Sequence, residues 1–162
     1  MAKRFTYHGK YRGVLVNTTD FRKLDERVAA AKEEAAEFII LRFQQIGEEC
    51  VRIARDSGDY HDISGNLRSS IDYVILRDGV PVVKGESKQY KGSSGNGEAG
   101  IPAAEALLAK LQAEFPWGIV LIVCAGMNYA AYVENIHHKD VLTSAELKAE
   151  SLLKKLLNGI VK

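Results

Sequence analysis

The segment from Asp20 to Asp56 constrains the fold of this chain more than any other. Its apolar side chains recur at every third or fourth position, and the opposite side is rich in Lys and Glu. The apolar positions are Leu24, Val28, Ala31, Ala35, Phe38, Ile39, Phe43, Ile46, Cys50 and Ile53. This spacing predicts a long amphipathic helix. Asn17 and Asp20 resemble a capping pair at its start.

The length of this predicted helix has a consequence for assembly. At 1.5 Å per residue it would span roughly 55 Å, whereas a compact chain of this size has a diameter of about 40 Å. A continuous helix would extend beyond the globule, unless Gly47 kinks it. In either case we expect apolar side chains near one end to need a neighbouring subunit to cover them.

Shorter patterns predict the remaining elements. Strands are expected at residues 71–76 and 80–83, joined by a hairpin turn at Asp78-Gly79, and at residues 119–125, stopped by Gly126 and Asn128. A helix from Pro102 to Phe115 is expected to bury Ala104, Leu107, Leu108, Leu111 and Phe115. A capping box of Thr143 and Glu146 is expected to start the last helix, which buries Ala145, Ala149, Leu152, Leu153, Leu156 and Ile160 and ends at Asn158-Gly159. The predicted fold class is α+β, with a long N-terminal helix and further helices packed on a small antiparallel β-sheet.

The composition predicts one domain over residues 1–162. The chain is 46% hydrophobic and 27% charged, which is enough apolar material for one core. Residues 86–100 are polar and glycine-rich, so we expect a loop that is mobile without a partner. The net charge of +1 argues against a basic coat for duplex DNA and favours protein partners. No apolar run has the form of a secretory signal or the length of a membrane span, so cytoplasm is the expected compartment.

A basic, aromatic arm occupies residues 1–16. It carries Lys3, Arg4, Lys10 and Arg12 without an acid, interleaved with Phe5, Tyr7 and Tyr11. One interpretation is a flexible terminus whose Tyr11–Val16 portion adds an edge strand. The other is an arm that binds a partner or touches nucleic acid.

Two short motifs stand out. The first contains Ser64, Gly65, Leu67, Ser70 and Ile71, where a turn starts a short helical piece that runs into a strand and Leu67 and Ile71 are expected to be buried. The second follows the apolar strand and contains Tyr129, Ala130, Tyr132, Val133 and Glu134. In a helix, Tyr129, Tyr132 and Val133 share one face. Such an aromatic patch suits an interface as well as an interior.

The order of these features resembles the tail-completion proteins of long-tailed bacteriophages, which are also called head-tail joining, neck or minor tail proteins. The shared order is a long helix, the S-G-x-L-x-x-S-I segment, a hairpin, a core strand and Y-A-x-Y-V-E. The resemblance implies a virion structural protein that forms an oligomeric ring during viral assembly in the host cytoplasm. Its partners would be itself, a head connector or adaptor, and tail terminator or tail-tube proteins, with a passing contact to DNA in the neck channel and none to membrane. It implies binding through the ten motif residues, without catalysis, cofactor or metal.

Other residues could indicate chemistry. Glu134, His137 and His138, followed by Asp140, could be the centre of a small metal-assisted enzyme, and His61 and Asp62 could complete the site if the fold brought them together. This enzyme is the alternative function. Nucleic-acid binding by the basic arm is a further alternative. Gly95, Gly97 and Gly100 spell G-x-G-x-x-G, but no strand precedes them and the next strand is followed by no acid, which argues against a dinucleotide site. Cys50 and Cys124 lie in apolar surroundings and are expected to be small buried hydrophobes.

Overall fold

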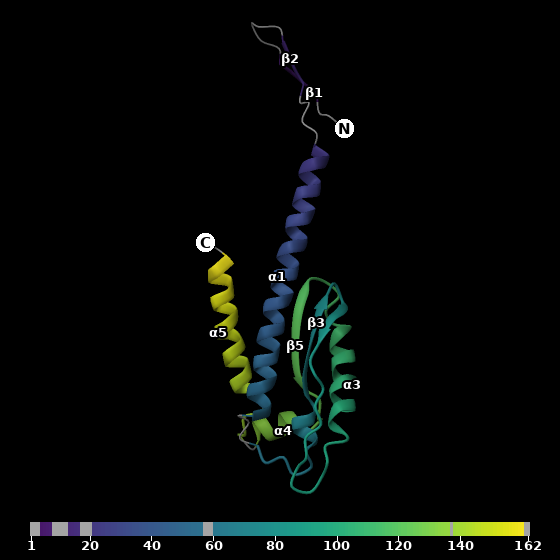
Figure 1. Cartoon of the computed structure of the whole chain (residues 1–162), viewed down its shortest axis with the longest axis vertical. Helices are drawn as coiled ribbons and strands as arrows, with labels where there is room; N and C mark the ends of the chain where they lie inside the picture. Colours follow the sequence, from purple (N-terminus) through teal and green to yellow (C-terminus); the bar gives the residue numbers. More distant parts are fainter. Residues whose placement is uncertain (1–3, 8–12, 17–20, 57–59, 137, 161–162) are drawn as a thin grey trace. The chain divides into compact units, whose positions relative to one another are not determined.

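The computed structural model describes residues 4–7, 13–16, 21–56, 60–136 and 138–160 (Figure 1). The chain divides into two compact units, Met1–Ala36 and Glu37–Lys162. The boundary falls inside the long helix α1, Phe21–Asp56. One domain over residues 1–162 therefore stays a prediction, whereas the predicted long helix is confirmed.

The first unit holds an antiparallel hairpin and the first half of α1. Strand β1, Arg4–Tyr7, pairs with β2, Gly13–Val16, with Arg4 opposite Val16. These strands form a sheet of their own, so β2 is not an edge strand of the main sheet as one interpretation of the arm proposed. The capping pair predicted at Asn17 and Asp20 lies outside the described residues.

A three-stranded antiparallel sheet forms the centre of the second unit. Its strands are β3, Ile71–Arg77, β4, Val80–Lys84, and β5, Ile119–Ala125, in the order β4-β3-β5. The predicted hairpin turn is confirmed, because Asp78 and Gly79 both have positive φ, 50° and 78°. That pair of angles is what an Asp-Gly two-residue turn requires.

Helices cover both faces of this sheet. Besides α1, two helices are long enough to pack along it: α3, Gly100–Gln112, and α5, Thr143–Ile160. Two are short: α2, Asn66–Ser69, and α4, Ala130–Asn135. Val74 and Leu76 pack on the α3 side, whereas Ile71, Tyr73 and Ile75 join the larger core with α1 and α5. The α+β prediction is confirmed (Figure 1).

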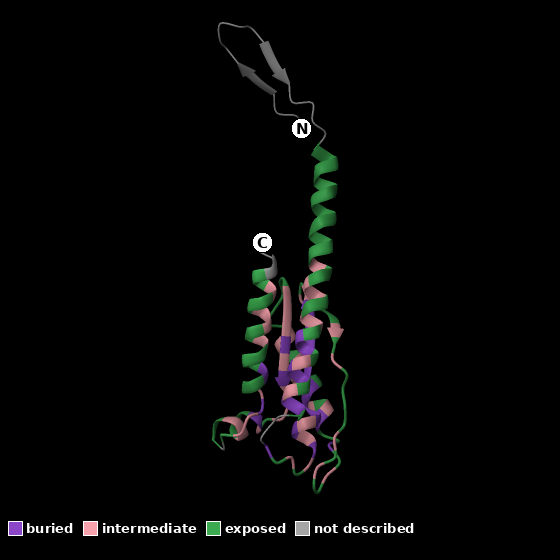
Figure 2. Ribbon diagram, turned by 60° about the vertical axis from the view of Figure 1, so that its left-hand side comes forward, coloured by how far each residue is buried: buried purple, intermediate pink, exposed green. Residues whose placement is uncertain are grey.

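Burial changes along α1. Residues 21–35 are all exposed, whereas Ile46, Cys50, Val51 and Ala54 are buried in the larger core (Figure 2). Gly47 does not break the helix, which runs without interruption to Asp56. A Cβ at this position would lie 2.6 Å from the Tyr73 ring, so the missing side chain lets the helix pack closely on β3.

Several boundaries differ from the predictions. Helix α5 continues to Ile160 instead of ending at Asn158-Gly159. Helix α3 ends at Gln112, so Phe115 lies beyond it and is exposed instead of buried. The start of α5 also differs, because the Glu146 N–H donates to the Leu142 carbonyl (2.8 Å) and not to a Thr143 side chain. Other groups hold the first turn of α5, as described below.

Among the described helices, none is both long enough and apolar enough to cross a membrane.

Candidate protein-binding surfaces

The first motif is a buried structural joint. Leu67, Ser70 and Ile71 are fully or almost fully buried, and Gly65 precedes α2 with a left-handed φ of 79°. The Ser70 hydroxyl donates to the Leu67 carbonyl (2.8 Å) and accepts from the Met127 N–H (3.3 Å). The Ser70 carbonyl accepts from the Gly126 N–H (2.9 Å). Ser70 therefore ties the first motif to the turn that leads into the second.

The glycine-rich segment lies against the same joint. The N–H groups of Ser94 and Gly97 donate to the carbonyls of Ile63 and Ser64, at 2.8 and 2.9 Å. The Tyr90 N–H donates to the Ser69 hydroxyl (2.7 Å). Mobility of this segment stays a prediction, but its hydrogen bonds to the motif are contacts that its composition did not indicate.

The glycines of this segment serve backbone packing. A Cβ at Gly95 would lie 2.6 Å from the Ser64 carbonyl oxygen, and one at Gly100 would lie 2.5 Å from the Asn66 carbonyl oxygen. Because neither neighbour is a flexible side chain, larger residues would force the backbone to shift. The G-x-G-x-x-G spacing thus has a packing explanation that needs no nucleotide.

The second motif divides between core and surface. Ala130 is buried, and Tyr129 and Val133 are half-buried against the larger core. Tyr132 is 54% exposed. Tyr129 is the N-cap of α4, and its carbonyl accepts from the Val133 N–H (2.9 Å), so these two residues align along the helix and both pack on the core. Only Tyr132 of this motif offers a large aromatic surface to a partner.

Glu134 caps the last helix. Its Oε1 accepts from the N–H groups of Leu142 (3.1 Å) and Thr143 (2.8 Å) and from the Thr143 hydroxyl (2.6 Å). Asp140 adds a bond from the Ser144 N–H (3.0 Å). These two carboxylates replace the predicted Thr143–Glu146 capping box. A carboxylate at a helix N-terminus satisfies free N–H groups and interacts favourably with the helix dipole.

The residues considered as metal ligands are not gathered in the described part of the chain. Within residues 4–7, 13–16, 21–56, 60–136 and 138–160, no group of three His, Cys, Asp or Glu side chains could hold a metal ion. His137 lies outside these ranges, and His138 and His61 are exposed. Asp62 accepts a bond from the Arg68 N–H (3.0 Å), which fixes the turn before α2.

Both cysteines are free and buried. Burial raises the pKa of the Cys50 thiol, and burial together with the Asp72 charge raises the pKa of Cys124 to about 12. A thiol with a raised pKa is a poor nucleophile at neutral pH, because the thiolate is the reactive form. The expectation that both are buried hydrophobes is confirmed.

A cation–aromatic cluster was not predicted. Arg55 at the end of α1 is buried and donates to the Ile71 carbonyl (2.6 Å) and the Glu86 carbonyl (3.3 Å). The charged groups of Arg55, Arg68 and Lys88 lie 5.3 to 5.7 Å from the centre of the Tyr90 ring. These distances are within the range of cation–π attraction. The cluster fastens the glycine-rich segment to α1 and β3, which is a structural role.

The first candidate surface is the apolar stripe on the first half of α1. Leu24 and Val28 are 52% and 45% exposed, and Phe21, Ala31 and Ala35 are also exposed. We call these five residues the α1 stripe. The covered continuation of the same pattern begins at Ile39, which is half-buried.

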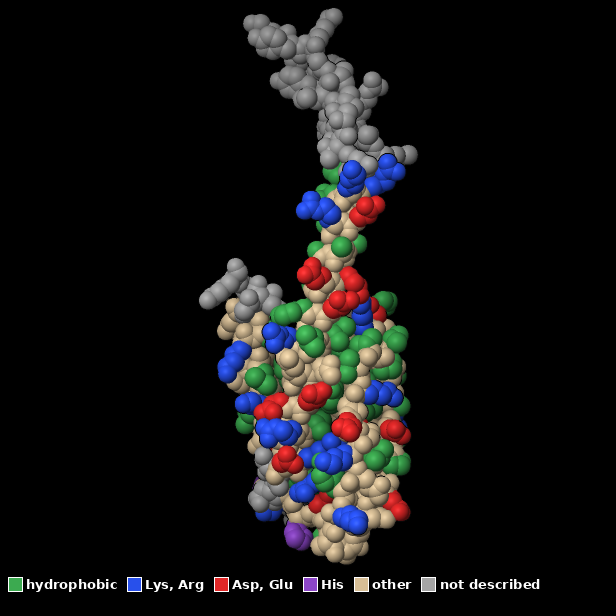
Figure 3. Space-filling view, in the orientation of Figure 1, with side chains coloured by type: hydrophobic (Ala, Val, Ile, Leu, Met, Phe, Trp, Pro, Cys, Tyr) green, Lys and Arg blue, Asp and Glu red, His purple; other side chains and the backbone are tan. Residues whose placement is uncertain are grey.

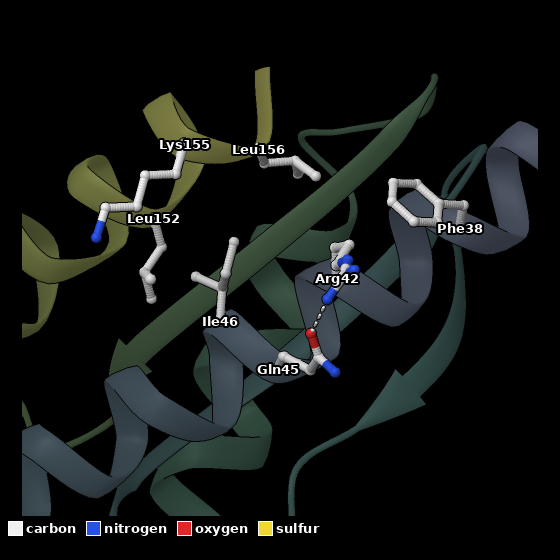
Figure 4. Close-up of a pocket in the computed structure, with 7 residues that line it drawn as sticks. All are labelled: Phe38, Arg42, Gln45, Ile46, Leu152, Lys155 and Leu156. Atoms are coloured by element: carbon white, nitrogen blue, oxygen red, sulfur yellow. Dashed lines mark hydrogen bonds between the residues drawn. The ribbon is translucent and has the colours of Figure 1, made fainter. Parts of the chain in front are cut away.

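The second candidate surface is a groove between the second half of α1 and α5. Its volume is about 500 Å³, and Figure 4 shows side chains of the two helices facing each other across it. Its lining consists of Phe38, Arg42, Gln45, Ile46, Leu152, Lys155 and Leu156. Arg42 donates to Gln45 (2.9 Å) and lies 5.1 Å from the Phe38 ring centre, so the polar side chains lie over apolar ones.

The third candidate surface is an apolar tip where β3 turns into β4. Trp117 is 81% exposed, and Val80 and Phe115 are also exposed. Hydrophobic side chains gather at this end of the sheet in Figure 3. Asp78 and Gly118 fix the tip, because each donates its N–H to the other, at 2.8 and 2.9 Å. Trp is one of the residue types enriched among the hot spots of protein interfaces.

No protein-family model, curated protein or solved structure matches this chain.

Proposed function

We propose that this chain is a structural protein of the neck of a long-tailed phage or prophage particle. It joins the head connector to the tail by self-association into a ring and by binding the adjoining proteins. Its place is the virion, and its work is binding and not turnover. The assignment to a phage particle rests on the resemblance of the two motifs and of the element order to tail-completion proteins.

The α1 stripe is the observation that carries the binding role. Helices in proteins gain most of their stability from packing an apolar face, and large contiguous apolar patches are uncommon on monomers. In the described part of the chain nothing covers the stripe, since Leu24 and Val28 remain about half exposed. A second subunit that packs against it would supply the missing cover.

Several apolar surfaces on one chain suit a ring better than a two-fold dimer. The α1 stripe, the α1–α5 groove and the Trp117 tip consist of different residues. A ring needs two different surfaces on each copy, because each copy meets its two neighbours through unlike faces. Further surfaces then remain for the proteins above and below the ring.

The fixed positions of the carboxylates support binding over catalysis. Glu134 accepts three hydrogen bonds at the start of α5, and Asp62 accepts one before α2. At these positions the two carboxylates accept hydrogen bonds from backbone N–H groups. They are thus explained without a reaction.

The test is deletion of the gene in a phage or prophage that carries it. Particles induced from the deletion strain should be DNA-filled heads and separate tails in electron micrographs, and the wild-type gene on a plasmid should restore joining. A Trp117→Ser copy should fold and yet restore joining poorly, whereas a Lys91→Ser copy, changed at an exposed polar position, should restore it fully. Normally joined particles from the deletion strain would contradict the proposal.

A further inference from the structure

The two edges of the main sheet differ in how they are protected. Edge strand β4 contains Pro81 and Lys84, and its pairing with β3 is shifted between Ile75 and Leu76. Proline, lysine and bulges are the usual devices that stop an edge from pairing with another chain. Edge strand β5, I-V-L-I-V-C-A, has none of them: it is uncharged and pairs with β3 in unbroken register from Ile71–Ala125 to Arg77–Ile119.

A hollow of about 500 Å³ runs along the open edge of β5. Ile119, Leu121 and Val123 belong to the side of the sheet that packs with α1 and α5, and Val120 belongs to the α3 side. All four line the hollow, so it reaches around the edge of the strand and not only over one face. Its other lining residues are Phe43, Cys50, Leu142, Ala145, Glu146, Ala149 and Leu153. The space is apolar, with one acid, Glu146.

The N-terminal hairpin would be stabilised by pairing with a further strand. Strands β1 and β2 form a sheet of two strands with four residues each. A two-stranded hairpin alone is marginally stable in water, and three or more strands are needed for independent stability. Strand β2, G-V-L-V, is uncharged and mostly apolar, as β5 is, and its four residues span about 13 Å against about 23 Å for the seven of β5.

Charge also fits. Residues 1–16 carry Lys3, Arg4, Lys10 and Arg12 and no acid, whereas the only charged residue in the lining of the β5 hollow is Glu146. Opposite charges at an interface favour one orientation and speed the encounter.

We propose that β2 of a second copy adds to the open edge of β5, with its apolar side chains in the hollow and the basic arm toward Glu146. This is strand addition, in which backbone hydrogen bonds give affinity and side-chain pockets give specificity. It rests on the self-association in the proposed function and not on a place in a phage neck. Since β2 and β5 are different surfaces, the contact is head-to-tail and can continue from copy to copy.

The test is cross-linking between two full-length variants with a short bis-maleimide. One copy carries Arg12→Cys, next to β2, and the other carries Glu146→Cys, which is exposed at the hollow. The native Cys50 and Cys124 are buried and should react slowly. The matched control pairs Arg12→Cys with Lys84→Cys on the protected edge β4.

We expect a cross-linked heterodimer in the Glu146→Cys mixture and at least about tenfold less in the Lys84→Cys mixture, the ratio that corresponds to about 1.4 kcal/mol. Equal yields in the two mixtures, or none in either, would overturn the proposal. A chain carrying both Arg12→Cys and Glu146→Cys that cross-links only within itself would also overturn it, because the arm would then bind its own chain.

A second measurement covers the case in which the new cysteines disturb the contact. Val14→Asp with Val16→Asp should weaken self-association at least about tenfold in sedimentation equilibrium, and Val82→Asp on β4 should not. If both variants assemble like the wild type, the proposal is wrong although the proposed function stands. If the wild type itself does not assemble, the proposed function fails first.

Discussion

The two halves of α1 share one sequence pattern and differ in what covers it. In the second half, Ile46 and Cys50 lie in the core beneath α5 and the sheet. In the first half, Leu24 and Val28 continue the same apolar spacing and remain about half exposed. Periodicity therefore identifies a helix and its apolar face, but not whether the chain itself or another subunit buries that face. The comparison separates residues that fold the chain from residues that are free to assemble it.

The largest difference is expected between matched truncations in the two halves. Ile46→Ala should lower the free energy of unfolding by about 2 to 5 kcal/mol, because it leaves a cavity in the core. Leu24→Ala should change it by less than about 0.5 kcal/mol under conditions where the protein is monomeric. Urea unfolding followed by circular dichroism measures both. Similar losses for the two variants would mean that the first half is also packed.

Leu67, in α2, is buried in the same core as the second half of α1. Leu67→Ala should destabilise the chain by about 2 to 5 kcal/mol, since its side chain is almost fully buried at the joint between the motifs. The neighbouring exposed Ile63 provides the control, and Ile63→Ala should have little effect. A change below about 0.5 kcal/mol for Leu67→Ala would place the motif at the surface.

Gly47 tests how closely the second half is packed. Ala is preferred over Gly in a helix by about 1 kcal/mol, so Gly47→Ala would stabilise an uncovered helix. Here a Cβ would lie 2.6 Å from the Tyr73 ring, and overpacking of this kind costs about 1 to 3 kcal/mol. We expect a lower melting temperature by differential scanning calorimetry. A higher one would show that the ring moves away easily.

Substitution of Glu134 distinguishes a helix cap from a metal ligand. Glu134→Ala should cost about 0.5 to 2 kcal/mol, the usual effect of losing a helix cap, and Glu134→Gln should cost less because its amide oxygen can still accept. Thermal unfolding with and without a chelator is the measurement. Stabilisation of the wild type by a transition metal, lost in both variants, would restore the metal-assisted enzyme as the leading interpretation.

The elements with strong local signals could be predicted from sequence. The long helix follows from its apolar spacing, and the hairpin follows from Asp78-Gly79, whose backbone angles few other residue pairs adopt without strain. The core strand follows from the run Ile119–Ala125 between a glycine before it and a glycine after it.

The features that depend on distant contacts could not be predicted. The glycines of residues 86–100 indicated a loop, but their packing on Ser64 and Asn66 is a tertiary property that local composition does not contain. The spacing of Tyr129, Tyr132 and Val133 does not contain their burial either: Tyr129 and Val133 pack on the core, whereas Tyr132 is 54% exposed. The exposed Trp117 had a signal in the sequence, a lone tryptophan between Pro116 and Gly118, and that signal was missed.

The most direct test of the account is the mass of the assembled protein with the α1 stripe changed. Leu24→Glu with Val28→Glu places charge on the stripe, and Lys23→Glu with Arg27→Glu introduces two glutamates, with a larger change of net charge, at neighbouring positions outside it. Sedimentation equilibrium should find oligomers for the wild type and for the Lys23/Arg27 variant and monomers for the Leu24/Val28 variant, with the same helix content in all three. One mass for all three proteins would contradict the claim that the first half of α1 is an assembly surface.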